Sequence, residues 1–167
     1  MQNGLKGTKP HLDVLLKSEN LVLGIESKFL EILSETKPVF SDNYFKINDH
    51  RKTSKWFQAM ELIVNGEASF TRLDAAQLIK HFFGICYKKS TEKRVLLYLF
   101  WEPVNASEQQ EYIKHRQELD DFSKMVAGNN LLEFRHLSYT KLWAQWENIP
   151  AMAEHCKNLQ ARYLIEI

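Results

Sequence analysis

Asp13, Glu26 and Lys28 are charged residues at positions where the surrounding pattern is apolar. Two apolar runs, 12–16 and 21–25, flank a short polar break, which is typical of a β-hairpin. Asp13 interrupts the first run, and Glu26 and Lys28 follow the second. Buried charges cost folding free energy unless they are paired or bound to a metal. These residues are therefore the first candidates for chemistry.

The expected register of this hairpin brings the charged side chains together. A two-residue loop at positions 19–20 sets Asp13 opposite Glu26. Directly opposed residues share a face of the sheet, with Cβ atoms about 5 Å apart. Because strand side chains alternate, Lys28 lies on the same face as Glu26. We expect the missing side chain of Gly24 to leave space for a ligand beside this cluster.

Two carboxylates this close repel each other unless a cation lies between them. Oxygen ligands of this kind suit Mg²⁺, and Mn²⁺ is a second choice. The backbone carbonyl of Ser27 is a candidate third ligand, so the expected metal site is Asp13, Glu26 and Ser27. Lys28 would then orient or deprotonate an attacking water. This set of groups is suited to hydrolysis of a phosphodiester bond.

A plainer interpretation of the same residues is structural. Glu26 and Lys28 could form a pair on an edge strand that deters aggregation, with Asp13 as a surface charge. The predicted register argues against this interpretation, because two opposed carboxylates are unfavourable on an ordinary surface.

The order of these residues resembles a known family. Positions 10–13 read Pro-His-Leu-Asp, and positions 26–28 read Glu-Ser-Lys. This arrangement resembles the PD-(D/E)xK, or restriction-endonuclease-like, nuclease superfamily. Segments 24–29 and 72–78 are also similar to an uncharacterised bacterial branch of that superfamily. The resemblance covers about positions 10–146 and implies an α/β fold with a small central mixed β-sheet flanked by helices.

The resemblance also implies roles for individual residues. Asp13 and Glu26 would bind Mg²⁺ and Lys28 would serve catalysis. A glutamine on the helix after the lysine strand orients the lysine or the substrate in exonuclease-like members, which makes Gln77 an accessory candidate. The chain departs from the family at its start, because many members begin with a helix that carries an acidic residue, and positions 1–10 are too few for one.

Two functions follow from this comparison. The first is a Mg²⁺-dependent nuclease acting on DNA. The alternative is a catalytically inactive module of the same fold that binds nucleic acid or a protein partner, which the short N-terminal lead-in favours. The sequence leaves open DNA or RNA as substrate, endonuclease or exonuclease action, and whether a homodimer acts on a duplex.

Composition sets limits on these functions. A chain of 167 residues is long enough for one domain with a real core. Its 22 basic and 21 acidic residues give no overall basic field, so nucleic acid must be bound by local patches. Cys86 and Cys156 lack metal-type spacing and are expected to be reduced thiols. With no apolar run of about 20 residues and no signal-like start, we expect a cytoplasmic protein without a membrane span.

The remaining elements follow from hydrophobic periodicity and capping signals. Positions 29–36 continue the strand or turn off it, and 37–50 form a loop. A capping-box variant at Thr71 predicts a helix that ends at Gly84. His81 on this helix is expected to be a satisfied structural histidine. The other predicted elements are a helix at 54–64, a central strand at 94–101, a helix from Ser107 to 126, a half-buried strand at 131–137, and helices at 139–146 and 150–165.

Two further groups of side chains have competing interpretations. Arg51, Lys52 and Lys55 make the entrance to the first of these helices basic, which indicates either a solvated surface or a phosphate contact. Trp143 and Trp146 have the spacing of a packing stripe, and we interpret them as core rather than as a surface for base stacking.

Overall fold

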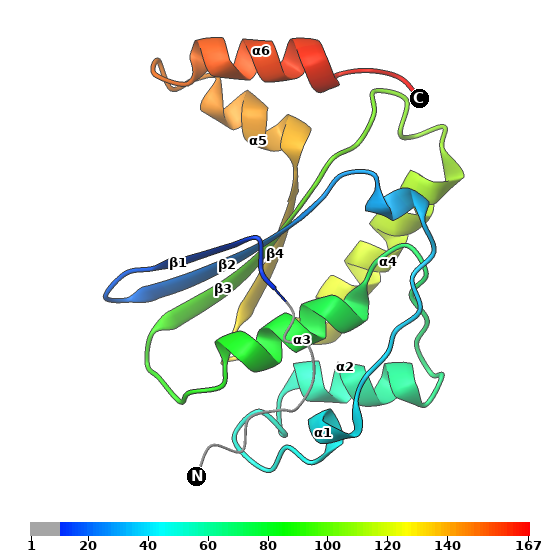
Figure 1. Cartoon of the computed structure of the whole chain (residues 1–167), viewed down its shortest axis with the longest axis vertical. Helices are drawn as coiled ribbons and strands as arrows, with labels where there is room; N and C mark the ends of the chain where they lie inside the picture. The colour runs from blue at the N-terminus through cyan, green and yellow to red at the C-terminus, as the bar shows by residue number, and fades with distance from the viewer. Residues whose placement is uncertain (1–10) are drawn as a thin grey trace.

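The computed structural model describes residues 11–167, in which four strands form one sheet flanked by helices (Figure 1). This confirms the predicted α/β class. The strands are β1 (Val14–Lys17), β2 (Leu21–Lys28), β3 (Lys93–Phe100) and β4 (Glu133–Ser138). The helices are η1 (Glu31–Leu33), α1 (Asp42–Phe45), α2 (Lys55–Val64), α3 (Ala75–Ile85), α4 (Gln110–Val126), α5 (Tyr139–Trp146) and α6 (Ala153–Tyr163).

The sheet is mixed, with the strand order β1-β2-β3-β4. β1 and β2 are antiparallel, whereas β2, β3 and β4 run parallel. β3 is central, and its near-continuous apolar sequence is buried on both faces, as predicted. The carboxyl ends of the parallel strands lie at the same edge of the sheet, where polar groups from several strands can meet.

The hairpin has the predicted register. Leu15 pairs with Gly24 and Val14 pairs with Ile25. The turn is closed by a hydrogen bond of 2.9 Å from the Ser18 N–H to the Leu21 carbonyl. The pairing ends at Val14, and Asp13 lies in a bend just before β1, so the predicted opposition of Asp13 and Glu26 stays a prediction.

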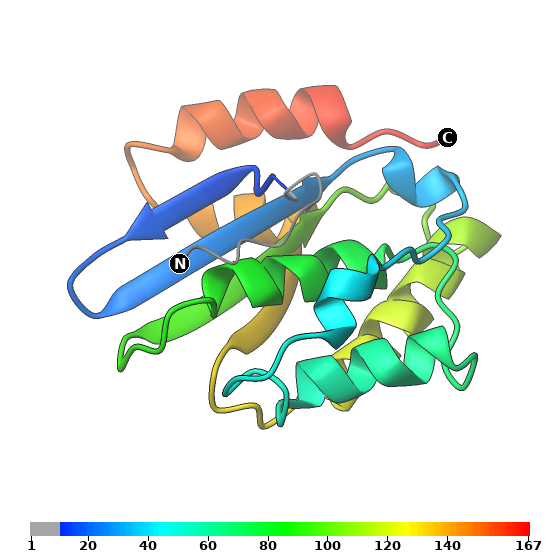
Figure 2. The ribbon, with the colours of Figure 1, turned by 60° about the horizontal axis from the view of Figure 1, so that its bottom comes forward.

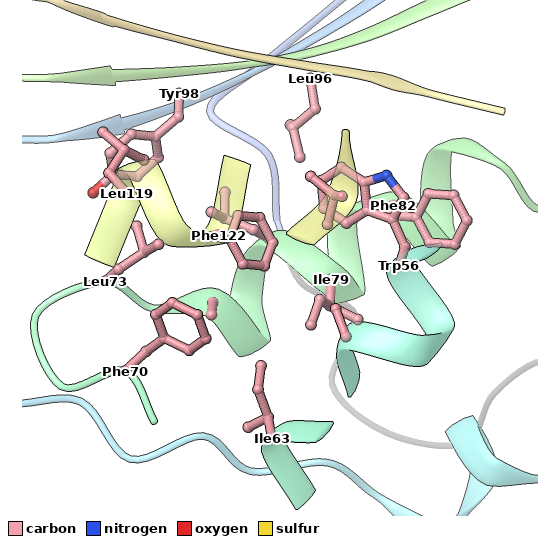
Figure 3. Close-up of a cluster of buried hydrophobic side chains, with 14 of the residues drawn as sticks. Trp56, Ile63, Phe70, Leu73, Ile79, Phe82, Leu96, Tyr98, Leu119 and Phe122 are labelled. Atoms are coloured by element: carbon pink, nitrogen blue, oxygen red, sulfur yellow. The ribbon is translucent and has the colours of Figure 1, made fainter. Parts of the chain in front are cut away.

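Helices cover the two faces of the sheet unequally. α2, α3 and α4 lie on one face, and α5 and α6 lie on the other (Figures 1 and 2). The main core lies between the sheet and the first group of helices, where Trp56 stacks on Phe82 with ring centroids 5.2 Å apart (Figure 3). Trp143 is buried and Trp146 packs against this core, which confirms both tryptophans as packing residues.

Two helix starts differ from the prediction. α3 begins after Asp74, whose side chain accepts the Gln77 N–H, and not at Thr71. Residues 71–73 are instead held by the buried carboxylate of Glu118, which accepts all three of their backbone N–H groups. α3 also continues through Gly84 to Ile85, and α4 begins at Gln110 without a side-chain cap from Ser107. The loop predicted at 37–50 contains the short helix α1.

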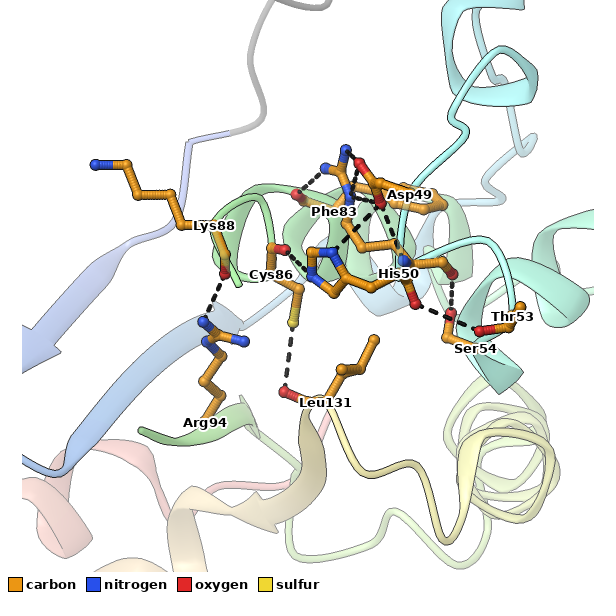
Figure 4. A network of polar contacts seen from close by, with 10 residues as sticks. Asp49, His50, Thr53, Ser54, Phe83, Cys86, Lys88, Arg94 and Leu131 are labelled. Carbon is orange, nitrogen blue, oxygen red and sulfur yellow. Dashed lines mark hydrogen bonds and ion pairs between the residues drawn. The ribbon is translucent and has the colours of Figure 1, made fainter. Parts of the chain in front are cut away.

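The basic entrance to α2 is mostly structural. Arg51 is 4% exposed, forms an ion pair with Asp49 and donates to the Phe83 carbonyl at 2.9 Å. Figure 4 shows Asp49 and Phe83 within this network of polar contacts. Lys55 donates to the Ala127 carbonyl. Both interpretations from the sequence, a solvated surface residue and a phosphate contact, are therefore wrong for Arg51. Its guanidinium links the loop before α2 to the end of α3.

The structure also bears on the predictions for the two cysteines and for a membrane span. Cys86 and Cys156 are free and buried, which agrees with reduced thiols. Among residues 11–167, no helix is long and apolar enough to cross a membrane.

Candidate functional site

Glu26 lies near the carboxyl end of β2, with its side chain on the sheet face that α3 covers. It is only 2% exposed. Its Oε1 accepts a hydrogen bond of 2.6 Å from Lys28 Nζ, and its Oε2 lies 2.8 Å from His81 Nε2. Lys28 lies two positions after Glu26 on the same strand, so the alternation of strand side chains puts both on the same face of the sheet. Two nitrogen groups from different elements thus hold one buried carboxylate.

The charge state of Glu26 follows from these contacts. Burial alone raises the pKa of Glu26. The hydrogen bonds and charges of His81 and Lys28 together lower it by more than burial raises it, so the net pKa lies below its usual value of 4.5. Glu26 is therefore an ionised carboxylate at neutral pH. Because such a carboxylate can only accept, the His81 Nε2 carries the proton of their hydrogen bond.

Asp13 lies just before β1 and reaches the end of β2 from the neighbouring side. Its Oδ2 accepts the Ser27 N–H at 2.7 Å. Backbone groups alternate in direction along a strand, and the Lys28 carbonyl points to β3, where it accepts the Trp101 N–H. The Ser27 carbonyl therefore points to the side of Asp13, and its role as a third metal ligand stays a prediction.

Ser27 is also held from the opposite face of the sheet. Its Oγ and the Tyr139 hydroxyl are 2.7 Å apart. Tyr139 begins α5 and packs against Phe29, with ring centroids 5.0 Å apart. The sequence analysis did not identify Tyr139, and only its position directly after β4, at the edge of the sheet where β2 and β3 also end, could have indicated it.

Gly24 does not provide the ligand space that we predicted. A Cβ atom at this position would lie 2.8 Å from Ile85 Cδ1 and 3.0 Å from Leu12 Cδ1. The space beside Gly24 is thus filled by apolar side chains from α3 and from the residue before Asp13. The glycine allows α3 to approach the sheet, which brings His81 on the same helix within reach of Glu26.

The three groups predicted to bind a metal are all oxygen donors. Among residues 11–167, no cluster of three or more His, Cys, Asp or Glu side chains is arranged to hold a metal ion. The available ligands are the carboxylates of Asp13 and Glu26 and the carbonyl of Ser27. This set fits Mg²⁺, which is commonly bound through one or two carboxylates and keeps several of its waters.

Gln77 and His81, both on α3, differ in the contacts described for their side chains. His81 is 2% exposed and has a partner, as expected of a structural histidine, but that partner is Glu26. Gln77 lies one turn before His81 and is half-buried, and its accessory role stays a prediction. Their spacing of four residues puts both side chains on one side of α3, but it did not predict the contact of His81 with Glu26.

Comparison with protein-family models gave a match that covers nearly the whole chain. The model of a protein family described as restriction endonuclease associating with ARP matches residues 2–164. No curated protein and no solved structure shows significant similarity to the chain. The four-stranded mixed sheet flanked by helices is consistent with a restriction-endonuclease-like fold. Because the family match spans nearly the whole sequence, the chain belongs to the family of restriction endonucleases associating with ARP.

Proposed function

We propose that this chain is a divalent-metal-dependent nuclease of the PD-(D/E)xK type that hydrolyses phosphodiester bonds in DNA. The observation that carries the proposal is the buried, ionised carboxylate of Glu26, held between Lys28 and His81 at the end of β2. Family membership supports a nucleic acid as substrate. A charged group in this position is costly for folding, which favours a role in chemistry.

Each residue of the site has a role in this proposal. Asp13 and Glu26, with the Ser27 carbonyl, hold Mg²⁺ or Mn²⁺. The cation, when bound, supplies positive charge opposite the phosphate oxygens. Lys28, as an ammonium, orients the attacking water. Only in its neutral form, after its own proton has gone to solvent, can Nζ take a proton from that water. Gln77 orients Lys28 or the substrate from α3.

Three finer expectations remain part of the proposal. DNA rather than RNA is the expected substrate, a homodimer is a candidate assembly on a duplex, and the cytoplasm is the expected location. Sedimentation equilibrium at several protein concentrations, with and without a DNA duplex, tests the homodimer.

The proposal is tested by measuring cleavage and binding together. Linear duplex, circular duplex, single-stranded DNA and RNA are incubated with Mg²⁺ and the wild-type chain, Lys28→Arg or Lys17→Arg. Lys28→Arg should keep much of the DNA affinity, which depends on summed phosphate contacts, but should lose most of the cleavage. Arginine cannot give up its proton, and its charge is spread over a planar group. Lys17→Arg is the matched control, because Lys17 is an exposed lysine on the same hairpin.

The outcomes separate the two functions. Cleavage by the wild type and Lys17→Arg, with loss in Lys28→Arg, supports the nuclease. Cleavage retained in Lys28→Arg would show that position 28 supplies only positive charge. Binding without cleavage of any of the substrates by the wild type would favour the inactive nucleic-acid-binding module.

A further inference from the structure

His81 is the one group that reaches Glu26 from outside its own strand among the contacts described. Its side chain is 1% exposed, and the only hydrogen bond described for it is the contact of 2.8 Å with Glu26 Oε2. An imidazole buried among apolar side chains is unfavourable unless it is hydrogen-bonded. An apolar side chain would fill this place on α3 without that requirement, so the imidazole needs a reason beyond packing.

α3 holds His81 in a fixed position. The helix is capped by Asp74, and the loop before it is tied to α4 through the three N–H groups that Glu118 accepts. The neighbouring residue Phe82 is fully buried and stacks on Trp56 of α2. The imidazole is therefore presented to the sheet by a helix that is anchored at its start and packed along its length.

The contact also distinguishes the two oxygens of Glu26. His81 takes Oε2, while Oε1 faces Lys28 Nζ. Without His81 only Lys28, among the described residues, would hold the carboxylate, and its plane could turn about the Cγ–Cδ bond of Glu26. Hydrogen bonds of this kind, which orient a ligand and do not touch the metal, commonly affect metal affinity by about 10- to 100-fold.

We propose that His81 is a positioning residue that donates its Nε2 hydrogen to Glu26 Oε2 and thereby fixes the carboxylate for cation binding. The inference rests on the proposed function, because it assigns the orientation of a group in the same site. It differs from a role as metal ligand, in which the imidazole nitrogen itself would bind the cation and favour Mn²⁺ over Mg²⁺.

The experiment measures metal binding by the full chain with isothermal titration calorimetry, using Mg²⁺ and Mn²⁺ separately. His81→Leu removes the donor and should weaken the binding of both metals by about 10- to 100-fold. His81→Gln places an amide nitrogen near the Nε2 position and should restore affinity to within a few-fold of wild type. His81→Asn is also polar but one methylene shorter, so it should fail like His81→Leu, and it replaces the leucine variant if that protein does not fold. His155→Gln is the control, since His155 is exposed on α6.

The outcomes distinguish this inference from the proposed function. Equal loss of Mg²⁺ and Mn²⁺ affinity in His81→Leu, with rescue in His81→Gln, supports the positioning role. Unchanged metal affinity in His81→Leu overturns the positioning role. A His81→Gln protein that binds Mg²⁺ normally but has lost Mn²⁺ affinity also overturns it, because that pattern is expected when the imidazole itself binds the metal. If the wild type neither binds these metals nor cleaves nucleic acid, the proposed function itself fails.

Discussion

Acidification should destabilise the fold through His115, a buried histidine of α4. Its side chain is 0% exposed, its Nε2 lies 3.0 Å from the Tyr98 hydroxyl, and its Nδ1 has no hydrogen-bond partner among the described residues. Burial lowers the pKa of His115 from 6.5 to about 4, and the charges of His136 and Arg116 act in the same direction. The charge of Glu118 opposes this shift but does not overcome it.

The size of the effect follows from proton linkage. Between pH 6.5 and 4 the unfolded chain binds a proton at position 115 that the folded chain does not bind. The stability that His115 contributes is therefore complete above about pH 6.5 and is lost as the pH falls toward 4. Going from pH 7.5 to pH 5 should lower the free energy of unfolding by about 2 kcal/mol through this residue.

Urea unfolding at pH 7.5 and pH 5 measures this difference when wild type is compared with His115→Gln. Glutamine does not titrate, and its amide can still bond to the Tyr98 hydroxyl. Carboxylates such as Glu26 titrate in both proteins, so their contributions cancel in the comparison. Wild type should lose about 2 kcal/mol more than His115→Gln. Equal losses in the two proteins would refute the argument that burial keeps His115 neutral.

Other predictions concern packing and the candidate site. Gly24→Val should lower the free energy of unfolding by about 1 to 3 kcal/mol, because even a Cβ at Gly24 lies 2.8 Å from Ile85 Cδ1. Gly84→Ala should raise the free energy of unfolding by about 0.5 to 1 kcal/mol, because Gly84 lies in a helix and nothing lies within 4 Å of the new Cβ. Urea unfolding of the Gly24 and Gly84 variants measures both effects. Asp13→Asn should leave the metal-free melting temperature unchanged or higher, because an amide oxygen can still accept the Ser27 N–H, while cleavage is abolished. A clear fall in that melting temperature would show that the Asp13 charge is structural.

Local patterns in the sequence determined the parts of the fold that could be predicted. The hairpin register follows from a short turn and alternating side chains, and Leu15 is indeed opposite Gly24. The apolar run of β3 indicated a strand buried on both faces. The start of α3 could not be predicted from a local pattern. Glu118, far along the chain, accepts the N–H groups of the residues before the helix, and Asp74 caps the helix instead. Capping signals at Thr71 and Ser107 were locally plausible, but tertiary contacts decided where each helix began.

The same distinction applies to the site. Asp13, Glu26 and Lys28 could be proposed from the sequence because all three lie on or next to one hairpin. The space at Gly24 was wrongly predicted, because Ile85 on α3 fills it and the hairpin alone contains no information about that helix. A contact between strands can be inferred from register, whereas a contact between a strand and a helix depends on packing that no short-range pattern specifies.

The buried cluster of Glu26, Lys28 and His81 is poorly explained by stability alone. Replacing a buried set of charged or polar partners with apolar residues of similar volume is often neutral or stabilising, because removing charges from water is costly. Here the sequence keeps a carboxylate, an ammonium and an imidazole against a core that contains Ile79 and Phe82. Places where a chain departs from the most stable choice are commonly functional sites. The departure occurs at the end of β2, beside Asp13, where we propose that the nuclease site lies.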